Sequence, residues 1–158
     1  MDPVEYALET SKQKALNIQD TWHVPASSAE FVETNGKNVL IYAADTVVVC
    51  QDGEILGKPR DLLEARRYLK KLSGSEHRII TGVSIIDEDG CMKQHHEETL
   101  IEFYDLSDDF IERYINTVEP YDKAGGYAIQ SVSGMIMVKR IVGSLLNCIG
   151  IARSEGGL

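Results

Sequence analysis

A long apolar run, VLIYAADTVVVC at residues 39–50, limits the folds that this chain can adopt. Its branched and apolar side chains predict a buried β-strand, and the polar QDGE that follows predicts a hairpin turn into a second, short strand. Similar patterns predict further strands at residues 77–87, 98–106 and 134–144. A β-sheet therefore forms the centre of the expected fold.

Apolar residues at helical spacing predict helices at residues 2–18, 61–74 and 107–119. The first has Asp2 as a candidate N-cap and Pro3 at the first helical position. Because hairpins and crossover helices alternate along the chain, we expect an α/β fold with a mixed β-sheet and flanking helices. A length of 158 residues is enough for one domain with a proper core.

Composition and charge narrow the class of partner. The net charge of −9 argues against a nucleic acid polymer, which binds to a basic face, but a single nucleotide stays compatible with a few converging lysines and a divalent cation. No apolar run approaches the roughly 20 residues of a membrane helix, so no membrane partner is expected. The three cysteines are widely spaced and form no Cys-x-x-Cys pair, which favours the cytoplasm as location.

Asp45 and Lys58 are the first candidates for chemistry. A carboxylate inside an apolar strand must be paired, metal-bound or neutralised, so Asp45 is either a structural cap or an acid in a ligand site at a strand end. Lys58 lies in LGKPRD, where Gly57 and Pro59 restrict the backbone on either side. It is either an ordinary surface lysine or a second member of a cleft shared with Asp45.

Glycines indicate two further places where the backbone is approached closely. In DKAGGYAIQ (122–130), Gly125 and Gly126 permit positive φ and let a ligand or another backbone lie against the main chain. Gly82, in the middle of an expected strand, also indicates a close approach, which makes its neighbour Thr81 a candidate for lining the site. The adjacent histidines of HHEE (95–98) point to opposite faces of a strand and are unsuited to sharing one metal ion.

Blocks spaced along most of the chain resemble the Maf family of house-cleaning nucleotide pyrophosphatases. They are ADTVVV, LGKPRD, LKKLSGSEHRIITGVSI, EPYDKAGGYAIQ and IVGSLLNCIG, and the resemblance runs from the first helix to about residue 150. It implies two lobes around a central cleft, as in Maf and ITPase-like folds, and hydrolysis of a nucleoside triphosphate to the monophosphate and pyrophosphate. ADT together with DKAGGYAIQ is similar to the branch that acts on dTTP, UTP and modified pyrimidine nucleotides.

The resemblance also implies roles for individual residues. Asp45 and Lys58 are the expected catalytic residues, with Asp45 binding a divalent cation, Mg or Mn, or acting as general base. The expected substrate-binding residues are Lys14, Thr46, Thr81, Lys123, Gly125, Gly126 and Gln130. The lysines would hold phosphate charge, and the Gln130 amide suits a pyrimidine edge or a phosphate oxygen.

The sequence departs from the family pattern at both ends. The family's N-terminal strand with its Ser-x-Ser-Pro-Arg-Arg loop and its final helix have no match here, and Ser131 stands where a glycine is expected. We therefore expect a single Maf-like domain over residues 1–158 that lacks both segments and can self-associate as a homodimer. Two hypotheses stay open: an active pyrimidine nucleotide pyrophosphatase, or a catalytically inactive relative with a nucleotide-binding or regulatory role.

Overall fold

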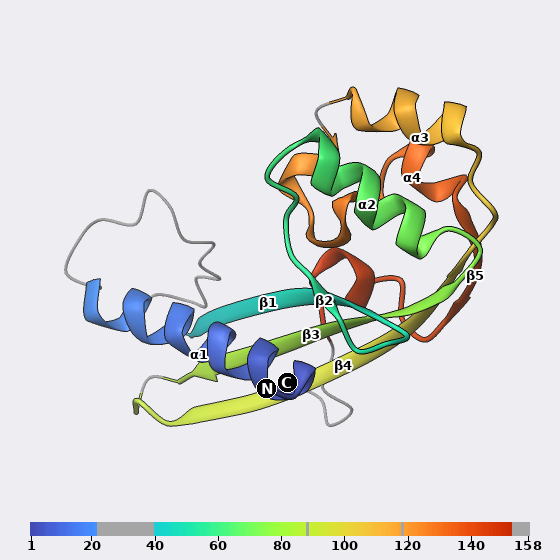
Figure 1. Ribbon diagram of the computed structural model, residues 1–158. Helices are drawn as coiled ribbons and strands as arrows, with labels where there is room; N and C mark the ends of the chain where they lie inside the picture. The colour runs from blue at the N-terminus through green and yellow to red at the C-terminus, as the bar shows by residue number, and fades with distance from the viewer. Residues whose placement is uncertain (22–39, 88, 118, 153–158) are drawn as a thin grey trace.

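The computed structural model describes residues 1–21, 40–87, 89–117 and 119–152. Helix α1 and the sheet form one part of the molecule, and α2, α3 and α4 form a helical lobe at the other end of the sheet (Figure 1). The helices and strands are α1 (Pro3–Thr21), β1 (Ile41–Cys50), β2 (Ile55–Leu56), α2 (Leu62–Leu72), β3 (Glu76–Ile86), β4 (Met92–Phe103), α3 (Asp108–Ile115), α4 (Val132–Met135) and β5 (Val138–Val142). Short 3-10 turns η1 (Glu119–Asp122), η2 (Ala124–Gly126) and η3 (Asn147–Ile149) complete the list.

The predicted helices are confirmed, and their first turns show why they begin where they do. Asp2 accepts a hydrogen bond from the Val4 amide at 2.9 Å, and Asp61 and Ser107 cap α2 and α3 in the same way. The third helix ends at Ile115, before the predicted stop at Pro120. The last predicted strand is shorter than expected, because α4 occupies its first residues.

Within the described residues, five strands form one sheet in the order β2-β1-β3-β4-β5, and every neighbouring pair is antiparallel. The α/β class with flanking helices is confirmed, but the parallel pairing implied by a mixed sheet is not found in this part of the chain. The crossover through α2 does join two strands of the same direction, β2 and β3. They do not pair, because β1 lies between them and is antiparallel to both.

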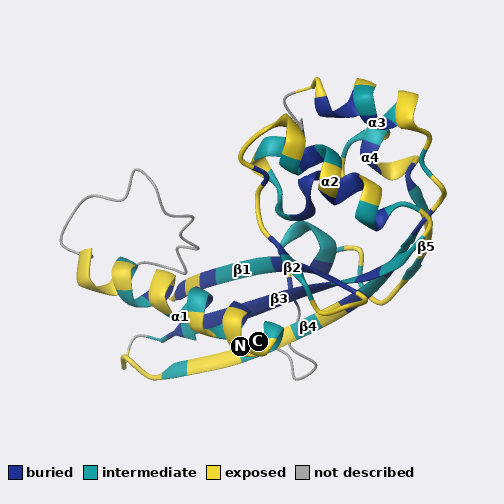
Figure 2. Ribbon diagram, viewed as in Figure 1, coloured by how far each residue is buried: buried dark blue, intermediate teal, exposed yellow. Residues whose placement is uncertain are grey.

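Two apolar cores hold the structure together on opposite faces of the sheet. Small residues let α1 pack closely on one face, where Ala7 and Ala15 are fully buried against strand residues such as Val47 and Ile86. The larger core lies between the sheet and the helical lobe, and includes Val48, Leu56, Leu69, Ile79, Phe103, Ile111 and Met137. Figure 2 shows this division, with the outer side of α1 exposed and β1 and β3 largely buried.

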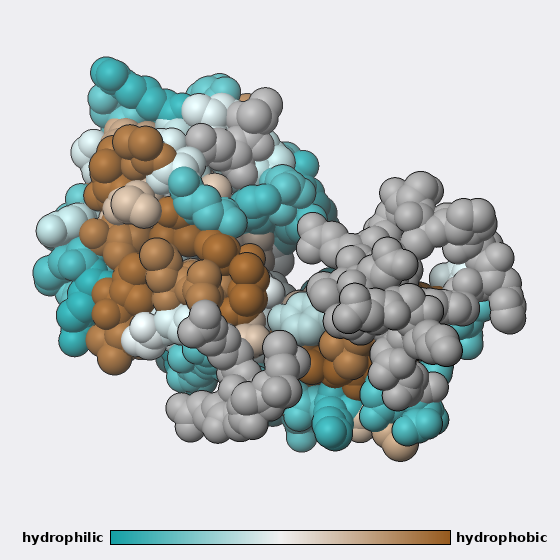
Figure 3. Space-filling model, turned by 180° about the vertical axis from the view of Figure 1, so that it is seen from behind, coloured by the Kyte–Doolittle hydropathy of each residue, from teal (hydrophilic) through white to brown (hydrophobic). Residues whose placement is uncertain are grey.

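The helical lobe has an apolar area on the face seen from behind in Figure 3. The exposed apolar residues of α4, β5 and the segments that follow them are Val132, Met135, Ile136, Val142, Leu145 and Ile151. A search of the described helices finds none with the length and apolar character that crossing a membrane requires.

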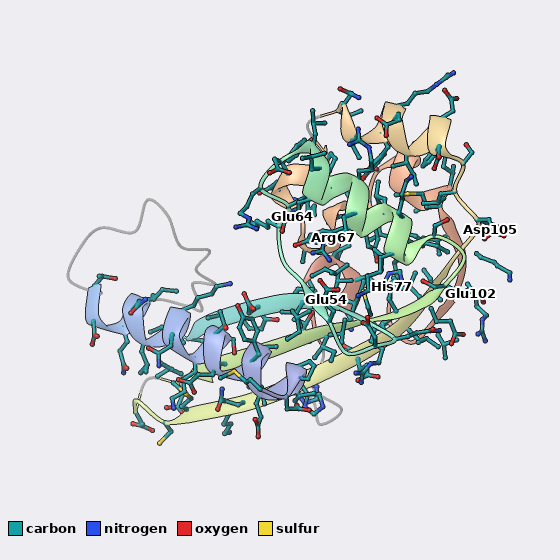
Figure 4. All side chains as sticks on the ribbon, viewed as in Figure 1. Glu54, Glu64, Arg67, His77, Glu102 and Asp105 are labelled. Atoms are coloured by element: carbon teal, nitrogen blue, oxygen red, sulfur yellow. The ribbon has the colours of Figure 1, made fainter. Side chains whose placement is uncertain are left out.

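His77 is a buried ionisable side chain between the sheet and the helical lobe (Figure 4). Its Nε2 lies 2.7 Å from the hydroxyl oxygen of Tyr127, and its ring packs edge-on against Phe103. Its Nδ1 is buried without a hydrogen-bond partner. Burial disfavours the charged imidazolium and lowers the pKa of His77 from its ordinary value of 6.5 to about 4.

Acidification from pH 6.5 toward pH 5 is expected to lower the free energy of unfolding. The folded-state pKa of His77 lies below its ordinary value, so the unfolded chain binds a proton that the native chain does not. The stabilisation is complete above pH 6.5 and falls by up to about 1.4 kcal/mol per pH unit as the pH drops toward the folded-state pKa. Urea unfolding at several pH values measures the slope, and His77→Gln, which does not titrate, should flatten it. Equal slopes for the two proteins would contradict the assignment of this pH dependence to His77.

Candidate active site

A cleft of about 430 Å³ opens where β2 ends, beyond which no strand among the described residues pairs with the outer edge of β1. Pairing between the two strands includes Val48 with Leu56 and Val49 with Ile55, so the stretch of β1 from Ile41 to Val47 is unpaired by β2. Residues of α1, β1, the segment after β2, the turns around η2 and the segment at η3 line the cleft. The predicted cleft between two lobes is therefore present.

Asp45 lies in this cleft and forms an ion pair with Lys14. The Lys14 Nζ donates to the Asp45 carboxylate at 2.6 Å and to the Ala44 carbonyl at 3.1 Å. The Asp45 side chain is 17% exposed, so it is largely removed from water, whereas the Lys14 side chain is 50% exposed. Of the three states open to a carboxylate in an apolar strand, the structure shows the paired one.

Lys58 and Lys123 come together at a second carboxylate, Asp122. Lys123 Nζ lies 2.7 Å from the Asp122 carboxylate and Lys58 Nζ lies 3.4 Å from it. Hydrogen bonds from Lys123 and then Lys58 lower the pKa of Asp122. All three residues line the cleft, so the structure brings both predicted lysines into the same site as Asp45. Asp122 was not among the residues predicted for the site, although its position next to Lys123 in the sequence could have indicated it.

Thr46 lines the cleft as expected, but Thr81 does not. Thr81 is fully buried beneath Thr46, with the two hydroxyl oxygens 2.9 Å apart, and its own hydroxyl donates to the Asn147 carbonyl at 3.1 Å. Thr81 therefore lies beneath the described wall of the cleft and does not line it. These residues lie opposite one another on neighbouring strands, which brings their side chains together below the cleft wall.

The double glycine contacts protein instead of lining the cleft. Gly125 and Gly126 have positive φ of 72° and 71°, as predicted, but both are buried. A Cβ on Gly125 would lie 2.9 Å from the Val48 side chain, and one on Gly126 would lie 3.4 Å from Pro59. The close approach inferred from these glycines is therefore an approach to packed side chains of the protein.

The end of the same segment does reach the cleft. Gln130 is exposed there, so its amide is available to a ligand. Ser131, where the family has a glycine, caps α4 by accepting a hydrogen bond from the Gly134 amide at 2.9 Å. The sequence reading missed Tyr6 and the backbone around Gly150, which also line the cleft. Tyr6 gave no distinguishing signal, because an aromatic residue on an amphipathic helix is usually a packing residue.

The carboxylates of the cleft are the groups through which it could contribute to binding a cation. In the described part of the chain, the cleft-lining carboxylates are Asp45 and Asp122, and no group of three or more His, Cys, Asp or Glu could hold a metal ion alone. Mg²⁺ is commonly bound by one or two carboxylates together with phosphate oxygens and water. The low-exposure carboxylate of Asp45 fits that pattern.

Comparison with known proteins assigns the chain to a family. The family model described as Maf-like protein matches residues 1–155. A dTTP/UTP pyrophosphatase from Thermosipho africanus is 47% identical over 119 residues, which are 75% of this chain and 61% of the relative. One from Pyrococcus furiosus is 42% identical over 150 residues, 95% of this chain and 70% of the relative.

A longer human relative is also similar. It is described as a probable bifunctional dTTP/UTP pyrophosphatase/methyltransferase protein and is 38% identical over 155 residues, 94% of this chain and 23% of the relative. The matched part of this chain thus covers less than two thirds of the length of the Thermosipho protein and slightly more than two thirds of the length of the Pyrococcus protein. On the family model and these identities, the chain belongs to the Maf-like protein family.

Proposed function

We propose that this chain hydrolyses pyrimidine nucleoside triphosphates, dTTP and UTP, to the monophosphate and pyrophosphate, and so removes unwanted nucleotides from the pool. The observation that carries the proposal is the arrangement of charge in the cleft: the low-exposure carboxylate of Asp45 paired with Lys14, in the same cleft as Lys58 and Lys123. The names of the Maf-like relatives support the same reaction.

In the proposed reaction, a water molecule attacks the α-phosphorus and the bond from that phosphorus to the bridging oxygen breaks. Asp45 accepts the proton of the attacking water, and the hydrogen bond from Lys14 positions its carboxylate. Lys58 and Lys123 offset the charge that develops on the departing pyrophosphate. A divalent cation, Mg or Mn, held by Asp45 and the phosphate oxygens, would polarise the phosphoryl group when bound.

Pyrophosphate release from a panel of canonical and modified triphosphates, with Mg²⁺ or Mn²⁺, tests the proposal. We expect release from dTTP and UTP to exceed release from purine nucleotides. Preference for a purine nucleotide would overturn the substrate class, and binding of triphosphate without release from any member of the panel would favour the inactive alternative.

Replacing Lys58 or Lys123 by Met is expected to weaken triphosphate binding by about 1.5 kcal/mol or more, the scale of a charge-assisted hydrogen bond. Calorimetric titration with a non-hydrolysable triphosphate measures the change. Lys70→Met is a matched control, since Lys70 forms an exposed ion pair with Asp108 at 3.3 Å outside the cleft. Unchanged affinity in both cleft variants would remove these lysines from the phosphate site.

The apolar area of Figure 3 supports a further proposal, that two copies of the chain associate through it. Sedimentation velocity of the chain and of an Ile136→Asp variant would test this, with dimers expected for the first and monomers for the second.

We place the protein in the cytoplasm, which is supported by its three free cysteines, Cys50, Cys91 and Cys148.

A further inference from the structure

Helix α1 brings Lys14 to Asp45, so its placement on the sheet decides the geometry of that pair. The buried face of α1 consists of Ala7, Ser11 and Ala15, one residue in every four. Four residues of helix rise about 6 Å and two residues of strand about 6.6 Å, so this face matches alternate residues of a strand beneath it. All three side chains are small, so packing by size would also accept α1 one turn away.

Two contacts place this face along β3. A Cβ added to Gly82 would lie 2.5 Å from the Ala7 carbonyl carbon. Two residues further along the strand, the Ser84 hydroxyl lies 2.8 Å from the Ser11 hydroxyl, and both serines are fully buried. Helix and strand therefore run along each other in matched steps.

The serine pair belongs to a closed ring of hydrogen bonds. The Leu8 carbonyl can only accept, so Ser11 donates to it at 2.9 Å, and the contact between the two serines uses the proton of Ser84. The Gln94 amide nitrogen donates to the Ser84 oxygen at 3.0 Å and to the same Leu8 carbonyl at 2.9 Å. Each donor of the ring has an acceptor, and the ring joins α1 to β3 and β4.

We infer that this ring sets the register of α1 on the sheet, which makes Ser11, Ser84 and Gln94 positioning residues for Lys14. If α1 slipped by one turn, about 5.4 Å, an alanine would replace Ser11 opposite Ser84, and a buried hydroxyl would lose its partner. The same slip would carry Lys14 out of reach of Asp45, which it contacts at 2.6 Å.

The ring is close to the catalytic pair but acts on it only through α1. Ser84 lies opposite Ala43, and Gly82 lies opposite Asp45, so the ring is one step along the sheet from the carboxylate. The described lining of the cleft does not include Ser11, Ser84 or Gln94. Their effect on turnover rests on the proposed function, in which Lys14 positions the Asp45 carboxylate.

The experiment measures kcat and KM for UTP in Ser84→Ala and Gln94→Ala, together with hydrogen exchange of the α1 amides. Both variants should raise exchange in α1. Each should lower kcat about tenfold, because a misplacement on the order of 1 Å can cost about a hundredfold. KM should change less than kcat, since Lys58 and Lys123 lie on other segments of the cleft.

A double-mutant cycle separates positioning from a loss of stability. In a Lys14→Met background, Ser84→Ala should have no further effect on kcat, because the side chain that it positions is absent. Ser107→Ala is the matched control, since it removes a hydroxyl that caps α3 by accepting from the Phe110 amide at 3.2 Å. This control should leave both kcat and the exchange of α1 at the wild-type level.

Three results would overturn the inference while the proposed function stands. They are an unchanged kcat or unchanged α1 exchange in Ser84→Ala, an equal fall of kcat in Ser107→Ala, and the same fall from Ser84→Ala with and without Lys14. Absence of hydrolysis of UTP and dTTP by the wild-type chain would overturn the proposed function instead. The exchange of α1 would then still decide whether the ring sets its register.

Discussion

Asp45→Asn is expected to lower the turnover of dTTP and UTP by about a thousandfold, the scale of a lost general base, while the fold is retained. Asparagine has nearly the same size, but it can neither accept the proton of the attacking water nor supply a negative charge to a cation. The Lys14 ammonium keeps the Ala44 carbonyl as a partner, so the local structure should persist. Pyrophosphate release and a thermal melt, measured on the same preparation, check both parts.

Asp52→Asn is the matched control for that experiment. Asp52 also pairs with a lysine, Lys71, at 2.7 Å, but the pair lies outside the cleft. Its loss should leave turnover near the wild-type level. Near-full activity of Asp45→Asn would assign Asp45 to a structural role, as a strand carboxylate that merely anchors α1.

Gly82→Ala is expected to reduce the free energy of unfolding by about 3 kcal/mol, at the upper end of the cost of overpacking. A Cβ at this position would lie 2.5 Å from the Ala7 carbonyl carbon and 2.6 Å from the Leu8 nitrogen. Because those atoms belong to the backbone of α1, the whole helix must move away from β3. Urea denaturation measures the loss.

The displacement should also reach the cleft, because α1 carries Lys14, the partner of Asp45. Turnover is therefore expected to fall together with stability. Gly57→Ala is a matched change for stability, since a Cβ on Gly57 meets nothing within 4 Å. An equal effect of the two substitutions on unfolding would show that contact with α1 is not what requires glycine at position 82.

Local sequence signals were sufficient for the elements and for some of the site. Apolar spacing and capping residues located the helices, and the charge of Asp45 in an apolar strand correctly indicated a residue with a partner. The sequence could not identify that partner as Lys14, because the two residues are brought together only when α1 packs on the sheet. The first residue of the strand expected at residues 39–50 and the last residues of the expected domain, 153–158, lie outside the described residues.

The glycines of this chain show which property of a site cannot be predicted from the sequence alone. A glycine signals that something approaches the backbone, but its missing side chain carries no information on whether a ligand or the protein does so. For Gly125 the approaching group is Val48, and for Gly82 it is α1.

The segments that form helices and strands, and the family pattern that the chain follows, could be predicted from the sequence, because these depend on local spacing and residue type. The antiparallel pairing of the described strands and the burial of Thr81 beneath Thr46 became known from the three-dimensional structure. Those properties depend on contacts between residues far apart in the chain, such as Thr81 with Asn147, and local periodicity does not specify them.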